Sequence, residues 1–111
     1  MAYVNQRAWD ALLDMERPPY LYDWHADRED IAQARQRLNA GASALGPQHP
    51  VANELLTCVR RIDEWLGRTS GLTGEQAERM AIDEYNLVIV PELQSAGRRI
   101  RPALASMQPS T

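Results

Sequence analysis

His25 lies between two carboxylates in the sequence, Asp23 and Asp27, and is the first position at which to look for chemistry. A histidine that is oriented by a carboxylate can act as a general base, provided that the two side chains face each other and a nucleophile lies within reach. Residues two apart in a chain need not face each other, and the pattern identifies no nucleophile. We therefore interpret His25 as a residue at the start of a helix, in an acidic cap region.

His25, His49 and Cys58 are the residues that could be metal ligands. Structural zinc sites have closely spaced ligand pairs, and the sequence contains none. Cys58 falls on an apolar helical stripe, where a cysteine behaves as a small buried hydrophobic residue. The stretch Gly71-Leu72-Thr73-Gly74 has neither the lysine nor the spacing of a phosphate-binding loop. The sequence therefore predicts no catalytic residue, no metal site and no cofactor.

All the basic residues are arginines, and Arg98, Arg99 and Arg101 form a cluster. Such a cluster can contact nucleic-acid phosphates, but it can equally complement the dipole at a helix C-terminus or bind the carboxylates of a protein partner. The formal net charge of −3 argues against nucleic acid, whose affinity for proteins comes largely from cationic contacts. A small DNA-binding regulator that uses Arg98–Arg101 is the alternative function.

The length of 111 residues predicts a single domain. One cysteine cannot form an internal disulfide, which excludes a disulfide-stapled secreted scaffold. The N-terminal residues have no apolar segment typical of a signal peptide, and no apolar run approaches the roughly 20 residues that span a bilayer. We therefore expect a cytoplasmic protein that does not interact with membranes.

Apolar residues recur at helical spacing along most of the chain, which predicts an all-α domain of four to five helices in a small bundle. The expected helices cover residues 5–16, 27–45, 50–67, 73–90 and 91–107. Asp27 is expected to cap the second helix, Pro50 to begin the third and Gly67 to end it. Thr73 and Gln76 form a capping box for the fourth. Within the domain, residues 1–24 are the N-terminal helix and an aromatic strap, 25–107 the helical core and 108–111 a frayed tail.

Residues 18–24, Pro-Pro-Tyr-Leu-Tyr-Asp-Trp, are too rich in proline and aromatic side chains for a helix interior. They are expected to form an extended strap whose side chains pack either in the core or against a partner. Tryptophan and tyrosine are residue types that anchor protein interfaces. The predicted partner-binding residues are Trp9, Leu12, Leu13, Tyr20, Tyr22 and Trp24.

Leu87-Val88-Ile89-Val90-Pro91 is a run of four apolar residues closed by a proline. We expect a helix to run to about residue 90, where Pro91 kinks it or begins a new helix. Composition also permits a β-strand, which would need a pairing strand from another molecule. In a lone helix, one or two of these four side chains would point to solvent. We therefore predict a homodimer whose interface comprises Tyr85, Val88, Ile89, Leu93, Ala96, Ile100 and Leu104.

The stretch from Trp9 to Met15, Trp-Asp-Ala-Leu-Leu-Asp-Met, leads into the aromatic strap, and together they resemble the small quorum-sensing anti-activators of the QslA type. The length, the helical layout and the acidic balance are also similar. The resemblance implies a homodimer that binds the ligand-binding domain of a LuxR-type transcription activator and blocks its dimerisation and DNA binding. It implies no catalytic residue. The predicted function is therefore negative regulation by sequestration.

Overall fold

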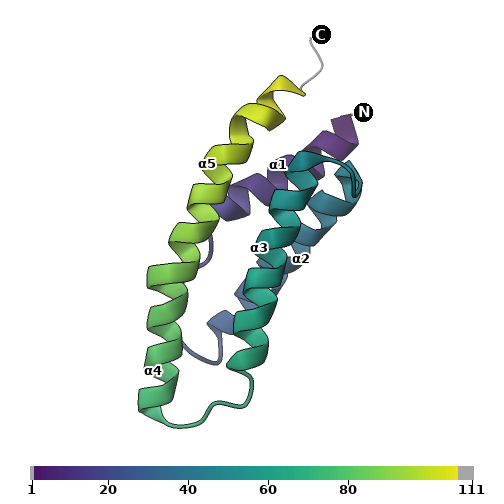
Figure 1. Ribbon diagram of the computed structural model, residues 1–111. Coiled ribbons are helices and arrows are strands. Elements are labelled where there is room, and N and C mark those ends of the chain that lie inside the picture. The colour runs from purple at the N-terminus through teal and green to yellow at the C-terminus, as the bar shows by residue number, and fades with distance from the viewer. Residues whose placement is uncertain (1, 108–111) are drawn as a thin grey trace.

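The computed structural model describes residues 2–107, with side chains described from residue 6 onward. Helices α1 (Ala2–Glu16), α2 (Asp27–Leu45) and α3 (Pro50–Arg68) are separate rods (Figure 1). The last rod is continuous and contains α4 (Glu75–Glu84), the π-helical segment η1 (Tyr85–Ile89) and α5 (Val90–Ser106). The described residues contain no strand, which confirms the all-α class and makes the strand alternative for residues 87–90 wrong. The predicted frayed tail, 108–111, lies outside them.

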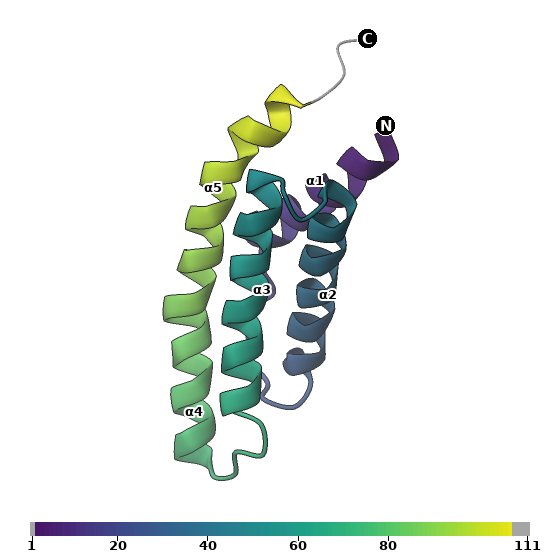
Figure 2. The same cartoon turned by 45° about the vertical axis from the view of Figure 1, so that its right-hand side comes forward.

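The helical rods form an elongated molecule with extents of 54 × 21 × 20 Å. α3 lies between α2 and the α4–α5 rod, and α1 crosses them at the end where α5 finishes (Figures 1 and 2). α1 packs against both α2 and α5 there. At the opposite end, α4 has no extensive helix–helix interface with α1, α2 or α3. Only Ala81 of α4 is fully buried, so α4 is a helix with much of its surface uncovered.

The core is a single cluster that draws on every rod and on the strap. The part of the core nearest to α4 is aromatic. The centroid of the Trp65 ring lies 5.1 Å from that of Tyr85 and 6.0 Å from that of Trp24. The indole N–H of Trp65 donates to the carbonyl of Ala81 at 3.2 Å, which satisfies its one polar group inside the core. This cluster fixes the strap and α4 to the end of α3.

Gly41 marks the place where α1 and α2 approach most closely. A Cβ atom built on Gly41 would lie 2.8 Å from the Cβ of Ala11 and 3.1 Å from the carbonyl oxygen of Arg7. The glycine weakens a helix interior by about 1 kcal/mol relative to alanine, but it allows the two backbones to pack together. Its place in the helix is therefore explained by the crossing.

Of the two predicted alternatives, Pro91 begins a new helix: α5 starts at Val90 with the proline in its first turn, and η1 joins α5 to α4 in one continuous rod. A proline inside an α-helix lacks an N–H donor and its ring clashes with the carbonyl of the residue four before it. The wider π turn precedes the proline, and the N–H of Val90 donates to the carbonyl of Tyr85, five residues back. Such single-turn π segments are frequent at functional sites.

Two expected helix caps are corrected. Asp27 is the first residue of α2 and follows the helical Ala26, with no side-chain cap there; the Asp27 carboxylate binds the strap instead. α4 begins after Gly74, also without a side-chain cap, so the capping box of Thr73 and Gln76 does not form.

The remaining ends of the helices differ little from expectation. α3 begins at Pro50 as predicted, and the His49 imidazole accepts the N–H of Val51 at 3.1 Å. α3 runs past Gly67 and ends at Arg68, with Thr69 as its C-cap. α1 begins at Ala2, three residues earlier than expected.

Candidate protein-interaction surface

The strap, residues 18–24, is held to the long helical rod by side chains of η1. The backbone N–H of Leu21 donates to Asn86 Oδ1 at 2.9 Å, and Asn86 Nδ2 donates to the Leu21 carbonyl at 2.7 Å. The Tyr85 hydroxyl donates to the carbonyl of Pro19 at 2.8 Å. Because an extended segment cannot form its own backbone hydrogen bonds, these partners supply what a neighbouring strand would supply in a sheet.

Two carboxylates fix the other end of the strap. Asp27 Oδ2 accepts the N–H groups of Tyr22 and Asp23 at 2.8 and 2.7 Å. Asp23 Oδ1 in turn accepts the N–H groups of His25 and Ala26 at 3.0 and 2.9 Å, so it is Asp23 that caps the turn leading into α2. The two N–H donors hold the pKa of the Asp27 carboxyl below its ordinary value. The strap backbone is therefore rigid.

The side chains of the strap divide between the core and the surface. Leu21 and Trp24 are buried in the core, whereas Tyr20 is 45% exposed and Tyr22 is 81% exposed. The two tyrosine rings stack on each other, with centroids 6.3 Å apart and planes 28° from parallel. From the sequence, these residues could pack either in the core or against a partner. In the structure, Leu21 and Trp24 are in the core, and Tyr20 and Tyr22 are exposed.

The other predicted partner-binding residues lie on α1 and divide in the same way. Leu12 is buried in the core, Leu13 is 50% exposed, and Trp9 is half-buried, with the Arg101 guanidinium 5.3 Å from its ring centroid. Of the six residues predicted to bind a partner, Leu12 and Trp24 are therefore corrected to core residues. Leu13, Tyr20 and Tyr22 remain available to one, and Trp9 is available only in part.

The predicted dimer interface needs a larger revision. Val88 is 43% exposed, but the other six residues are buried inside the single chain: Tyr85, Ile89, Leu93, Ala96, Ile100 and Leu104. They face α1, α3 and the strap and cannot contact a second copy without unfolding. Leu87, which the heptad-like spacing omits, is 72% exposed. The exposed part of the run is therefore Leu87 with Val88.

The arginine cluster on α5 braces helices within the chain. Arg99 bonds the Glu54 carboxylate at 3.2 Å through two nitrogens, and Arg101 bonds Glu16 through two nitrogens at 2.6 Å. The hydrogen bonds from Arg101 hold the pKa of the Glu16 carboxyl below its ordinary value. Of the three arginines proposed to contact DNA, Arg98 is the one without an ion-pair partner among the described residues. Two charges of the cluster are thus already neutralised.

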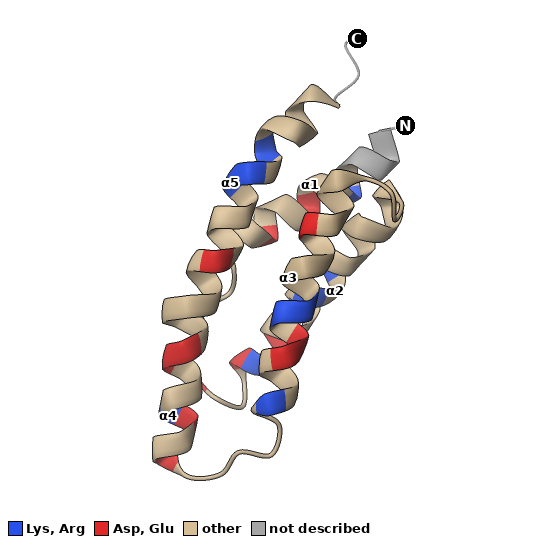
Figure 3. Ribbon diagram, viewed as in Figure 1, with Lys and Arg blue, Asp and Glu red and all other residues tan. Residues whose placement is uncertain are grey.

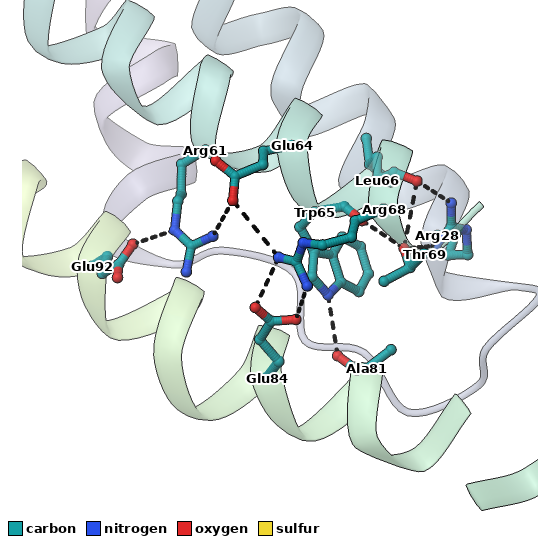
Figure 4. Close-up of polar contacts among 10 residues, drawn as sticks. All are labelled: Arg28, Arg61, Glu64, Trp65, Leu66, Arg68, Thr69, Ala81, Glu84 and Glu92. Atoms are coloured by element: carbon teal, nitrogen blue, oxygen red, sulfur yellow. Dashed lines mark hydrogen bonds and ion pairs between the residues drawn. The ribbon is translucent and has the colours of Figure 1, made fainter. Parts of the chain in front are cut away.

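Similar pairs connect α3 to the long rod (Figure 4). Arg68 bonds Glu84 through two nitrogens at 2.9 Å, and Arg61 bonds Glu92 at 2.9 Å. The Arg68 bonds hold the pKa of the Glu84 carboxyl below its ordinary value. Val88 lies on the helix midway between these two glutamates, four residues from each. Its apolar side chain is therefore flanked by ion pairs.

None of the candidate chemical residues forms a reactive group. His25 is exposed, and its backbone rather than its ring is held by Asp23. Cys58 is buried, and burial raises the pKa of its thiol to about 11. Across the residues for which side chains are described, no group of histidine, cysteine and acidic residues is arranged to hold a metal ion.

A groove of about 430 Å³ runs between the strap and α4. Residues 21–25 form one wall, and one face of residues 75–86 forms the other. We call it the strap–α4 groove. Tyr22 stands on its edge, and Asn86 joins its two walls.

Arg28 is a further residue that sequence patterns do not single out. Its guanidinium lies 4.7 Å from the Trp24 ring centroid and 5.4 Å from that of Trp65, and it donates to Thr69 Oγ1 at 2.8 Å and to the Leu66 carbonyl at 3.3 Å (Figure 4). A cation at this place complements the C-terminal dipole of α3. Arg28 therefore links Trp24 of the strap to the C-terminal end of α3.

Comparisons of this chain with protein-family models, with curated proteins and with solved structures found no match. No helix in residues 2–107 is both long and apolar enough to span a bilayer.

Proposed function

We propose that this chain is a protein-binding module whose contact surface is the outer face of the strap. The observation that carries the proposal is the exposure of Tyr20 and Tyr22, stacked on a backbone that five side-chain hydrogen bonds to Leu21, Tyr22, Asp23 and Pro19 hold in place.

Rigid presentation matters because association is opposed by the ordering of side chains and loops, at roughly 0.5–1.5 kcal/mol for each immobilised flexible side chain. Tyrosine has two side-chain torsions and a large amphipathic ring, so it contributes contact area at a low entropic cost. In a folded, fixed strap most of that ordering has already occurred. The fold thus supports two tyrosines as the centre of an interface.

The partner that we propose is a LuxR-type transcription activator, bound through its ligand-binding domain. This identity rests on the resemblance of residues 9–24 to the quorum-sensing anti-activators. The module would act as a negative regulator by covering the surface through which the activator dimerises, so that DNA binding is lost. Such action requires apolar and aromatic surface that is held in a fixed conformation, and it requires no catalytic group. The strap, whose backbone is bound to η1 and to Asp27, offers such a surface.

We also propose that the protein self-associates through Leu87 and Val88. Full burial of one aliphatic side chain contributes about 1.5–3 kcal/mol, and association costs at least about 4 kcal/mol. Four partly exposed side chains, two from each copy, therefore exceed the association cost only where that cost is near its lower bound. The expected dimer depends on concentration, and Val88→Asp should make it monomeric in sedimentation-velocity ultracentrifugation.

The function is tested with a purified LuxR-type activator bound to its fluorescent operator DNA. Adding this protein in excess should lower the fluorescence anisotropy as the DNA is released. The double variant Tyr20→Ala/Tyr22→Ala should release much less DNA while keeping the circular dichroism spectrum of the parent. Operator DNA that stays bound in the presence of excess parent protein would contradict the proposed target.

A further inference from the structure

Six of the twelve arginines bind carboxylates of other helices, whereas two acidic residues of α4 beside the strap have no such partner. Glu16, Glu54 and Glu84 each bind an arginine, and so do Asp14 and Asp63. Glu78 and Asp83 of α4 have no ion-pair partner among the described residues. Both line the strap–α4 groove, and acidic residues recur along α4 (Figure 3).

The whole groove is acidic. Asp23, Glu75, Glu78 and Asp83 line it, against the single guanidinium of Arg79, which gives a formal charge of −3. Arg79 itself is 4.0 Å from Glu75 in a largely exposed pair, which neutralises little. The groove thus carries a charge that the chain itself does not balance.

The edge of the groove is aromatic as well as acidic. Tyr22 is one of the lining residues and is 81% exposed, one side of its ring stacks on Tyr20, and the strap hydrogen bonds fix its backbone. The face of an aromatic ring attracts cations, and arginine in particular stacks flat on it. A carboxylate nearby adds the bidentate hydrogen bonds that the planar guanidinium is shaped to donate.

A ring and a carboxylate with an arginine between them occur at another place among the described residues. Arg101 lies over the Trp9 ring at 5.3 Å from the centroid and donates two hydrogen bonds to the Glu16 carboxylate. The strap–α4 groove is likewise lined by an aromatic residue, Tyr22, and by carboxylates, and its one arginine, Arg79, leaves a formal charge of −3 unbalanced. We infer that this groove binds an arginine-bearing basic segment of the partner protein, a conclusion that rests on the proposed protein-binding function.

The inference is tested with a fluorescein-labelled helical peptide that carries arginines one helical turn apart together with leucines. A second peptide has citrulline at each arginine, which keeps the shape and removes the charge. Binding is measured by fluorescence anisotropy. The arginine peptide should bind with a Kd below about 1 mM, and the citrulline peptide should bind at least about tenfold more weakly, a difference of 1.4 kcal/mol.

The double variant Glu78→Gln/Asp83→Asn should weaken binding of the arginine peptide by about tenfold or more. Its matched control is Asp10→Asn/Asp30→Asn, which removes the same formal charge from exposed positions outside the groove. The control should change the Kd by less than about threefold. Equal weakening in both double variants would overturn the inference, as would equal binding of the citrulline peptide.

A second copy of this chain is the competing occupant, because Arg17, Arg60 and Arg98 are exposed. If sedimentation velocity showed that Glu78→Gln/Asp83→Asn dissociates a dimer of the parent, the groove would hold that copy and the inference would be wrong. Unchanged sedimentation supports the inference.

The failure of this inference is distinguishable from failure of the proposed function. Partner capture that is lost in Tyr20→Ala/Tyr22→Ala but kept in Glu78→Gln/Asp83→Asn would overturn the basic segment and leave the binding module standing. If this protein bound the arginine peptide at the groove but did not release any activator from its operator, the proposed target would be overturned instead. Loss of capture in both variants, with folding intact, supports both.

Discussion

Asn86 illustrates how one side chain in this protein takes the place of a neighbouring strand. Its amide accepts the Leu21 N–H and donates to the Leu21 carbonyl, and both groups are partly shielded from water. A lost hydrogen bond leaves a buried backbone group unsatisfied, which costs about 1–3 kcal/mol. The exposed tyrosines on each side of Leu21 owe their position to this residue.

We therefore predict that Asn86→Ala lowers the free energy of unfolding by about 1–3 kcal/mol, measured by urea denaturation. Asn53→Ala, at an exposed helical position, is the control for the intrinsic helix preference of alanine. It should leave stability unchanged or slightly raised. Equal stability of the two variants would show that the Asn86 hydrogen bonds do not hold the strap.

Asp27 makes the strap sensitive to acid. Its pKa is lowered in the folded state by the N–H donors of Asp23 and Tyr22, so its stabilisation is present above the unfolded pKa of about 3.9 and is lost as pH falls through the lower folded value. Asp27→Asn should be less stable than the parent at neutral pH, and the difference should shrink below about pH 4. Thermal unfolding at several pH values measures it. A pH-independent difference for Asp27→Asn would contradict this role.

Cys58 should be nearly inert in the folded protein. With a thiol pKa of about 11, the reactive thiolate at pH 8 is roughly a hundredfold scarcer than for an ordinary exposed cysteine, and burial adds a steric barrier. Ellman's reagent should react slowly with the native protein and rapidly in denaturant. Rapid reaction of the native protein would place Cys58 at the surface.

At the scale of the helices, the crossing of α1 and α2 is the most sharply constrained contact. Gly41→Ala places a Cβ 2.8 Å from that of Ala11, so we predict a loss of about 1–3 kcal/mol in stability despite the better helix former. Gly67→Ala, in α3, meets nothing within 4 Å and is the matched control. It should stabilise by up to about 1 kcal/mol. Equal effects of the two substitutions in denaturant unfolding would contradict the close crossing.

Helices α1, α2 and α3 were predictable because each has an apolar stripe at helical spacing and a clear break after it. No such break separates α4 from α5. The Asp27 contact was not predictable, since a carboxylate at a helix start looks the same in sequence whether it caps that helix or binds a distant backbone N–H. The start of a helix at Pro91 was one of the predicted alternatives, but the π turn that joins it to α4 was not predictable. A π turn has no sequence pattern of its own, and it is seen here from the bond between the Val90 N–H and the Tyr85 carbonyl.

Which side chains face outward depends on the whole molecule. Heptad-like spacing on the last rod correctly marks a continuous apolar stripe, but the same stripe can be covered by a second copy or by the chain itself. Here α1, α3 and the strap cover it, and Leu87 and Val88 stay exposed. In an extended strap, alternation places Tyr20 and Tyr22 on the face opposite Leu21. It does not predict which of the two faces is buried.

The central claim is that stacked Tyr20 and Tyr22 on a fixed strap are the contact surface for a protein partner. The most direct measurement compares how much of the purified activator the immobilised parent retains with the amounts retained by Tyr20→Ala/Tyr22→Ala and Met80→Ala. Met80 is an exposed apolar residue on the side of α4 that faces the end of α3, so it controls for general loss of apolar surface. The account predicts stoichiometric retention by the parent and by Met80→Ala, with at least about tenfold weaker binding by the tyrosine variant. Equal retention by all three folded proteins would contradict it.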